Sequence, residues 1–376
     1  MTLQTEAATA ASAQSTPAAE AAGRLVSLDA LRGFDMFWIV GAEDLVHGLN
    51  EVGGGEAGGV TGFLAEQLSH VPWAGFHFYD LIFPLFVFLT GVGAVFSLDK
   101  IVAREGKRKA YVRVFRRFLL LYFVGILYYG GMSRVWPEMR LVGVLQRIAT
   151  AYFFASLLYL NLKRRGLIVA CTLILVGYWS FMTFVPVPAE PQLTQIDPAW
   201  GHGGRSYDEG NNWTNYIDFH YLPGRRHDKQ WDPEGLLSSI PAVGSALLGV
   251  FAGMLLKDRE LDDKRKALYL MGAGALVVAA GYLWGLQFPI VKKLWTSSFV
   301  LVAGGYSAML LGLFHLVIHV GGLRRWAVPF LWIGCNALTA YLAAHFIDFG
   351  ELADLFVGGH VKQAAGAYGE IGRAHV

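Results

Sequence analysis

The residues best suited to chemistry lie just before a long apolar stretch. His70, His77 and Asp80 fall close together, and no charge follows between Leu81 and Leu98. An imidazole titrates near neutrality and can take a proton from an amine or a hydroxyl. A carboxylate beside it can fix its tautomer and stabilise the imidazolium. The pattern predicts an acid–base pair in which His70 is the leading partner of Asp80. His77 is the competing partner, and a helix capped by Asp80 is the simpler alternative.

Two further groups of polar residues sit in apolar surroundings. Gln146 and Arg147 lie inside an apolar block, where a hydrogen bond between helices explains them as well as a functional role does. Asn336 and His345 lie nine residues apart on the last clear apolar segment, so they share a helix face only loosely. We expect both to line a site, with His345 toward the same side as His70.

Lys292 and Lys293 precede Trp295. On the residues alone this pattern favours an anchor at the membrane interface, because lysine and tryptophan are common there.

Several well-known motifs do not occur in the chain. It has no HExxH, no cysteine pair spaced for zinc, no P-loop and no GxSxG, and its two cysteines, Cys171 and Cys335, lie far apart in apolar blocks. The glycine-rich segment 53–59 lacks the strand and helix that a nucleotide-binding loop needs. We therefore expect no metal and no disulfide framework.

The composition indicates a membrane protein. Of 376 residues, 54% are hydrophobic and 16% are charged, against about 25% charged in soluble proteins. The apolar residues form repeated blocks, which predicts an all-α, polytopic transmembrane helical bundle. The net charge of +2 gives no reason to expect a nucleic-acid partner.

About nine spans are predicted. They cover roughly 28–49, 79–98, 110–131, 141–160, 166–185, 235–256, 267–287, 295–319 and 326–349. The first carries six ionisable residues, among them Glu43 near its far end, so it must face protein or a water-filled cavity rather than lipid.

The remaining segments are polar. We interpret 1–23 as a disordered cytoplasmic tail, 24–349 as the transmembrane domain, and the long segment 186–234 within it as a structured lid over a site. The tail 350–376 contains no credible span. Its ending, EIGRAHV, resembles translated adapter sequence, so we expect that at least one C-terminal span is missing.

The distribution of basic residues predicts the orientation. With a cytoplasmic N-terminus, the cytoplasmic connections hold 18 Lys and Arg residues and the opposite ones hold 8. Positive charge is enriched on the cytoplasmic side of membrane proteins. His70, Asp80, Glu43 and the 186–234 segment are then on the outer side.

Seven segments resemble one known family. They are RLVSLDALRGFDMF at 24–37, HVPWAGFHFYDLIFPLFVFLTG at 70–91, RLVGVLQRIATAYF at 140–153, NNWTNYIDFHYLPG at 211–224, WDPEGLLSSIPAVGSALLGVFAG at 231–253, PIVKKLWTSSFVL at 289–301 and GCNALTAYLAAHFID at 334–348. In these motifs the chain resembles the heparan-alpha-glucosaminide N-acetyltransferase family of transmembrane acyltransferases and its bacterial members. The resemblance covers about 24–348, in order.

The resemblance implies an enzyme of the bacterial inner membrane. It would transfer an acetyl group from cytosolic acetyl-CoA to an amino sugar or glycan fragment in the periplasm, and a homo-oligomer is compatible with it. The family's active histidine corresponds to His70 and its aspartate to Asp80. Its lysine corresponds to Lys292, and its late asparagine and histidine correspond to Asn336 and His345.

One departure from the family concerns the acceptor. An asparagine of the lysosomal enzyme is replaced by Glu43, whose carboxylate can pair with an ammonium or act as a base. The large luminal N-terminal domain has no counterpart in this chain. We therefore expect an acceptor other than heparan sulfate.

The residues leave two other functions open. A permease for sugars or other small molecules would also need charged residues in its first span. A catalytically silent assembly partner is the third interpretation, and the intact pair of His70 and Asp80 argues against it.

Overall fold

The described part of the chain is built from helices. The computed structural model describes residues 25–42, 46, 48, 59–188, 190, 193 and 207–347, and within them it has isolated β-bridges but no strand. The long helices are α5 (Tyr79–Glu105), α6 (Lys107–Tyr128), α7 (Val144–Asn161), α8 (Arg164–Phe184), α10 (Ser239–Lys257), α11 (Asp263–Gly285) and α12 (Ser297–His315). The shorter ones are α2 (Val26–Phe37), α4 (Val60–Gln67), α9 (Trp213–Tyr221), α13 (Val328–Cys335) and α14 (Ala337–Phe346). The predicted all-α class is confirmed.

Fewer helices qualify as membrane spans than the sequence predicted. By length and composition, the described residues contain five helices able to cross a bilayer (α5, α8, α10, α11 and the helix Ser297–Val320), or six if the bent pair of Arg325–Cys335 and Ala337–Phe346 is one span. The predicted count of nine is not confirmed. The segments expected at 110–131 and 141–160 do form helices, α6 and α7, but neither qualifies as a span. Basic residues reach well into α6, and Gln146 and Arg147 lower the mean hydropathy of α7.

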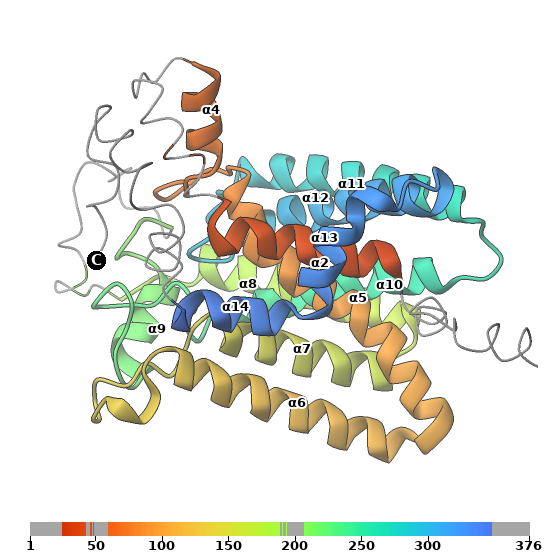
Figure 1. The fold of residues 1–376 in the computed structure, drawn as a ribbon. Helices are drawn as coiled ribbons and strands as arrows, with labels where there is room; N and C mark the ends of the chain where they lie inside the picture. The colour runs from red at the N-terminus through yellow and green to blue at the C-terminus, as the bar shows by residue number, and fades with distance from the viewer. Residues whose placement is uncertain are drawn as a thin grey trace, which may run out of the picture.

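Helix α5 forms the centre of the bundle. It packs against α10, α7 and α12, and its buried side chains belong to the largest apolar core. The connections at the start of α5 and around α9 lie at one end of the bundle, and the turns from α5 to α6 and from α10 to α11 lie at the other (Figure 1). The residues around Asp80 are therefore far from the basic turn that follows Glu105.

Two glycines set the distance between α5 and α10. A Cβ atom added to Gly249 would lie 1.9 Å from the carbonyl oxygen of Phe88, and one added to Gly91 would lie 1.9 Å from that of Ala246. In a membrane, where lipid is as apolar as the protein core, such close backbone packing is a main source of helix association. These positions therefore hold the central helix pair together.

The first predicted span is interrupted. Helix α2 ends at Phe37, and a π-helical turn, Trp38–Ala42, follows with Gly41 at φ 139°. Asp35 is fully buried, and Arg32 pairs with Asp29 at 3.0 Å. The charges of this helix thus face the protein, as the sequence predicted.

The last predicted span is not one helix. Helices α13 and α14 meet at Asn336 with a bend of 70°, so the expected continuous helix over 326–349 is wrong. Phe330 packs edge-on against Phe34 and Phe37 of α2. Gly334 has no room for a Cβ, because it lies against the carbonyl of Asp29. The predicted tail 1–23, residue Glu43 and the segment 350–376 lie outside the described residues.

We predict that Gly249→Val disrupts the fold, because overpacking a tight interface typically costs about 1–3 kcal/mol or more. Gly177→Val is the matched control, since no atom lies within 4 Å of the Cβ it would add. Fluorescence-detected size-exclusion chromatography and thermal unfolding in detergent would compare them. Equal monodispersity and unfolding temperature in the two variants would contradict the packing role of Gly249.

Candidate active site

Asp80 is a buried carboxylate on which several groups converge. It sits in the first turn of α5 and is 1% exposed. Its Oδ2 accepts hydrogen bonds from the backbone N–H groups of His77 at 3.1 Å and Val71 at 3.3 Å, and its Oδ1 lies 2.9 Å from Nδ1 of His70. The segment from His70 to His77 is thereby folded back over the start of the helix.

A second loop brings a lysine to the same carboxylate. The backbone N–H of Gly75 donates to the carbonyl of Ile290 at 2.9 Å, next to a β-bridge between Ala74 and Val291. This pairing places Nζ of Lys292 at 3.3 Å from Oδ1 of Asp80. The ammonium of Lys292 therefore belongs to this cluster, where the residues alone favoured an interface anchor and the resemblance implied a site residue.

The cluster determines which nitrogen of His70 can act. A carboxylate only accepts hydrogen bonds, so Nδ1–H of His70 donates to Asp80 and Nε2 keeps its lone pair. The Lys292 ammonium lies 3.0 Å from Nδ1 and 3.3 Å from Nε2 of the same ring. The His70 side chain is 54% exposed, so a ligand can reach it. Nε2 is thus the ring nitrogen that can accept a hydrogen bond from a ligand.

His77 faces away from this cluster. Its Nδ1 donates to the backbone carbonyl of Ser69 at 3.0 Å, and its Nε2 lies 4.0 Å from Glu66. Only its backbone contacts Asp80. Of the two histidines that the sequence offered, the structure brings the side chain of His70 to Asp80.

His70, Asp80 and Lys292 line one large cavity of about 1110 Å³. Asp80 and Thr90 both line it from α5, ten residues apart, so it extends about 15 Å along that helix. Arg32 and Arg117 line it as well. Its volume slightly exceeds the range of about 300–1000 Å³ that is usual for small-molecule sites. The cavity therefore has room for more than one small ligand.

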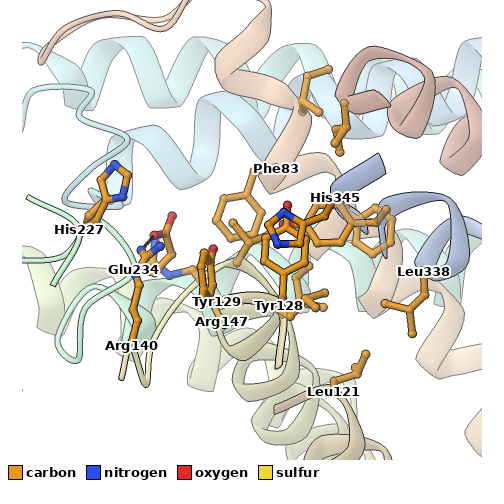
Figure 2. A pocket seen from close by; sticks show the side chains of 18 of the residues that line it. Phe83, Leu121, Tyr128, Tyr129, Arg140, Arg147, His227, Glu234, Leu338 and His345 are labelled. Atoms are coloured by element: carbon orange, nitrogen blue, oxygen red, sulfur yellow. Dashed lines mark hydrogen bonds and ion pairs between the residues drawn. The ribbon is translucent and has the colours of Figure 1, made fainter. Parts of the chain in front are cut away.

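Of the other predicted site residues, His345 lines the cavity and Asn336 does not. His345 lines the cavity from α14, and its ring stacks on Tyr128 with centroids 4.0 Å apart. Figure 2 shows it facing the same space as Glu234 and Tyr129. Asn336 is exposed at the bend, donates to the carbonyl of Trp332 at 3.2 Å, and does not line the cavity. Glu43 lies outside the described residues, so its place in the site stays a prediction.

The cavity is also lined by an ionic network around Arg140, which the sequence did not single out. Arg140 makes a two-pronged ion pair with Asp232, through Nε at 2.9 Å and Nη2 at 2.7 Å, and its Nη2 also binds Glu234 at 2.8 Å. The available signal was the pair of acids in WDPEG, just before α10, but nothing in the sequence linked them to Arg140. Arg147 of α7 donates to Ser238, the residue before α10, which is the kind of bond that one of the two explanations left open for this residue requires.

The described helices and their cavity define a polytopic membrane protein with a polar site at one end. In sequence, this chain is 28% identical to human heparan-alpha-glucosaminide N-acetyltransferase over 321 residues, 73% of the chain and 48% of the relative. It is 26% identical to the mouse protein of the same name over 330 residues, 74% of the chain and 49% of the relative. These similarities confirm the predicted resemblance and support membership of that family. The chain spans about half the length of both relatives, and no family model matches it.

Asp218 fixes the polar segment before α10, which carries Asp232 and Glu234. It is fully buried in α9, and its side chain accepts backbone hydrogen bonds from Leu236 at 2.9 Å and Asp232 at 3.3 Å. Burial raises the pKa of its carboxyl from 3.8 to about 7, although the two backbone N–H groups oppose the rise. Its protonation is therefore linked to the stability of this segment.

We predict that this stability falls as the pH rises from about 4 to about 7 and then levels off. A carboxyl whose pKa is raised on folding stabilises the folded state fully below its unfolded value near 3.8, and that contribution is lost as pH rises through about 7. Asp218→Asn should flatten this pH dependence of the unfolding temperature, whereas Asp258→Asn, at an exposed position, should not. An unchanged pH profile in Asp218→Asn would refute the linkage.

Proposed function

We propose that this protein is a membrane N-acetyltransferase that moves an acetyl group from acetyl-CoA to an amino sugar or related acceptor. The observation that carries the proposal is the cluster of His70, Asp80 and Lys292 at the end of a cavity large enough for two substrates. The two relatives are named for N-acetyl transfer to a glucosaminide, which supports the same reaction class here.

His70 acts as the general base in this mechanism. Its Nε2 takes a proton from the acceptor nitrogen as that nitrogen forms a bond to the acetyl carbonyl carbon. The carbon–sulfur bond then breaks, and the proton passes from His70 to the departing sulfur, which leaves as the CoA thiol. Asp80 holds the tautomer and stabilises the imidazolium, a combination that typically contributes about 100- to 10,000-fold to rate. An acetyl-histidine intermediate is the alternative route for the same residues.

The donor enters from the cytoplasmic side in this proposal. Arg32 and Arg117 line the part of the cavity that extends toward the basic turn between α5 and α6. Positive charge at a cavity entrance raises the local concentration of an anionic ligand. The phosphates of acetyl-CoA would be attracted there, with the acetyl group directed toward His70.

The acceptor enters from the opposite, periplasmic side. His345 lines the cavity and is proposed to contact it, as is Glu43, which corresponds to an asparagine in the family. Asn336 is exposed, so any contact with substrate requires movement at the bend between α13 and α14. The membrane would be the bacterial inner membrane, with the N-terminus in the cytoplasm.

The orientation can be tested with single cysteines. In a background with Cys335 replaced by serine, Tyr221→Cys should react with an impermeant thiol reagent added to intact cells, because Tyr221 is 68% exposed at the outer end. Arg108→Cys, exposed in the turn at the other end, should react only after the membrane is opened. The reverse pattern would overturn the proposed sidedness of the whole site.

The role of His70 can be tested against His77. In proteoliposomes supplied with acetyl-CoA and amino sugars, His70→Ala should reduce CoA release by about 100-fold or more. Asp80→Asn should also be severe, because it removes the charge that orients His70. His77→Ala should have a milder effect, since its side chain faces away from the cavity.

The same assay separates the enzyme from a permease. An enzyme consumes acetyl-CoA and releases CoA, whereas a permease moves solute without it. If His77→Ala is inactive and His70→Ala is active, the site has been assigned to the wrong histidine. If both variants keep full CoA release, this cluster does not carry the transfer.

A further inference from the structure

The ionic network of Arg140, Asp232 and Glu234 has no role in the transfer described above. Asp232 is fully buried and holds Arg140 through two parallel hydrogen bonds, and Arg140 in turn holds Oε2 of Glu234. Such paired geometry fixes both position and angle. Glu234 is therefore a carboxylate with a defined position rather than a mobile surface group.

Glu234 presents its carboxyl to the cavity. Its side chain is 13% exposed and lines the cavity. Its Oε2 accepts a hydrogen bond from Arg140, and the carboxyl also contacts the side chain of Asp232. Burial raises the pKa of Glu234, with Asp232 adding to the rise and Arg147 and Arg140 opposing it. In either protonation state the carboxyl can form a hydrogen bond with a hydroxyl group of a ligand.

Arg147 supplies a donor from the facing helix. It is 2% exposed, lines the cavity, and lies with its guanidinium 4.7 Å from the ring centre of Trp295. Its Nη2 donates to Ser238, but its Nε has no partner in the described part of the chain, where no carboxylate pairs with it either. A buried guanidinium with incomplete hydrogen bonding is costly unless a ligand completes it.

The charges of this wall nearly cancel. Two guanidinium groups, of Arg140 and Arg147, face two carboxyl groups, of Asp232 and Glu234. A balanced set of this kind does not favour a strongly anionic or cationic ligand. It offers an acceptor and a donor side by side, which is what hydroxyl groups require because each hydroxyl both donates and accepts.

Trp295 contacts both Arg147 and the loop that carries Lys292. Its indole lies against Arg147, and its backbone N–H donates to the carbonyl of Lys292 at 2.9 Å. The same ring also packs edge-on against Phe83, one turn after Asp80 on α5. The wall and the cluster around His70 thus share one aromatic residue and line one cavity.

We propose that Glu234 and Arg147 form a subsite that binds the ring hydroxyls of the acceptor sugar. This inference rests on the proposed function for the identity of the acceptor, and it adds the residues that select a neutral polyhydroxylated ring. The subsite holds the ring while the amine faces His70. Glu234 and Arg147 act through binding and do not touch the reacting atoms.

The test is a binding titration that needs no turnover. Purified protein in nanodiscs is titrated with glucosamine and, separately, with glucose, and each Kd is measured by saturation-transfer NMR. Glu234→Gln should weaken both sugars by about tenfold, since hydrogen bonds to charged groups are the strong ones. Arg147→Gln should do the same. Glu138→Gln, an exposed carboxylate at the rim of the same cavity, should leave both values within about twofold.

Three results would overturn the subsite. They are a wild-type protein that binds neither sugar, a Glu234→Gln variant that binds both as wild type does, and a Glu234→Gln variant that loses glucosamine but keeps glucose. The last would show that Glu234 binds the ammonium rather than hydroxyls. If Arg147→Gln does not fold, Glu234→Gln decides alone, because it keeps the shape of the side chain. Sugar binding that persists without any acetyl transfer would refute the proposed function and leave the subsite standing.

Discussion

The buried carboxylate of Asp80 is the group on which this end of the helical bundle depends. A charge at the start of a membrane helix is expensive, so it has to be neutralised by groups brought from elsewhere in the chain. Here the backbone of the preceding loop, the ring of His70 and the ammonium of Lys292 all converge on it. The contacts that stabilise the buried charge of Asp80 are therefore the same contacts that orient His70.

The position of that cluster relies on the close packing of α5 and α10. Glycines at their crossing allow backbone to touch backbone, and α5 in turn packs against α7 and α12. Helix α10 begins directly after the segment that carries Asp232, Glu234 and Ser238, so the same packing places the ionic network. A separation between these two helices would move both walls of the cavity at once. The geometry of the polar site therefore depends on the packing of α5 against α10.

Hydrophobic blocks were sufficient to predict the helical class, and the types and spacing of His70 and Asp80 predicted their pairing while leaving His77 as a competitor. The hydrophobic blocks could not predict where helices break, because the bend at Asn336 and the turn at Trp38–Ala42 depend on packing rather than on apolar content. Local sequence alone favoured an interface anchor at Lys292, and only the resemblance assigned it to the site. A lysine beside a tryptophan has the same local sequence at a membrane interface and in a site, and only the pairing of two distant loops distinguishes them. The bond between Arg140 and Asp232 spans 92 residues and leaves no local pattern.

The two polar walls differ in how their charges are arranged, and this difference suggests a division of labour. Around His70 the charges are close together and the imidazole is half exposed, which suits the proton transfer proposed for it. Around Arg140 each charge is fixed by a partner of opposite sign, which suits recognition because a preorganised group loses little entropy on binding. Trp295 lies between the two and contacts both. A low-dielectric setting strengthens every one of these interactions, so small displacements of this tryptophan would alter binding and proton transfer together.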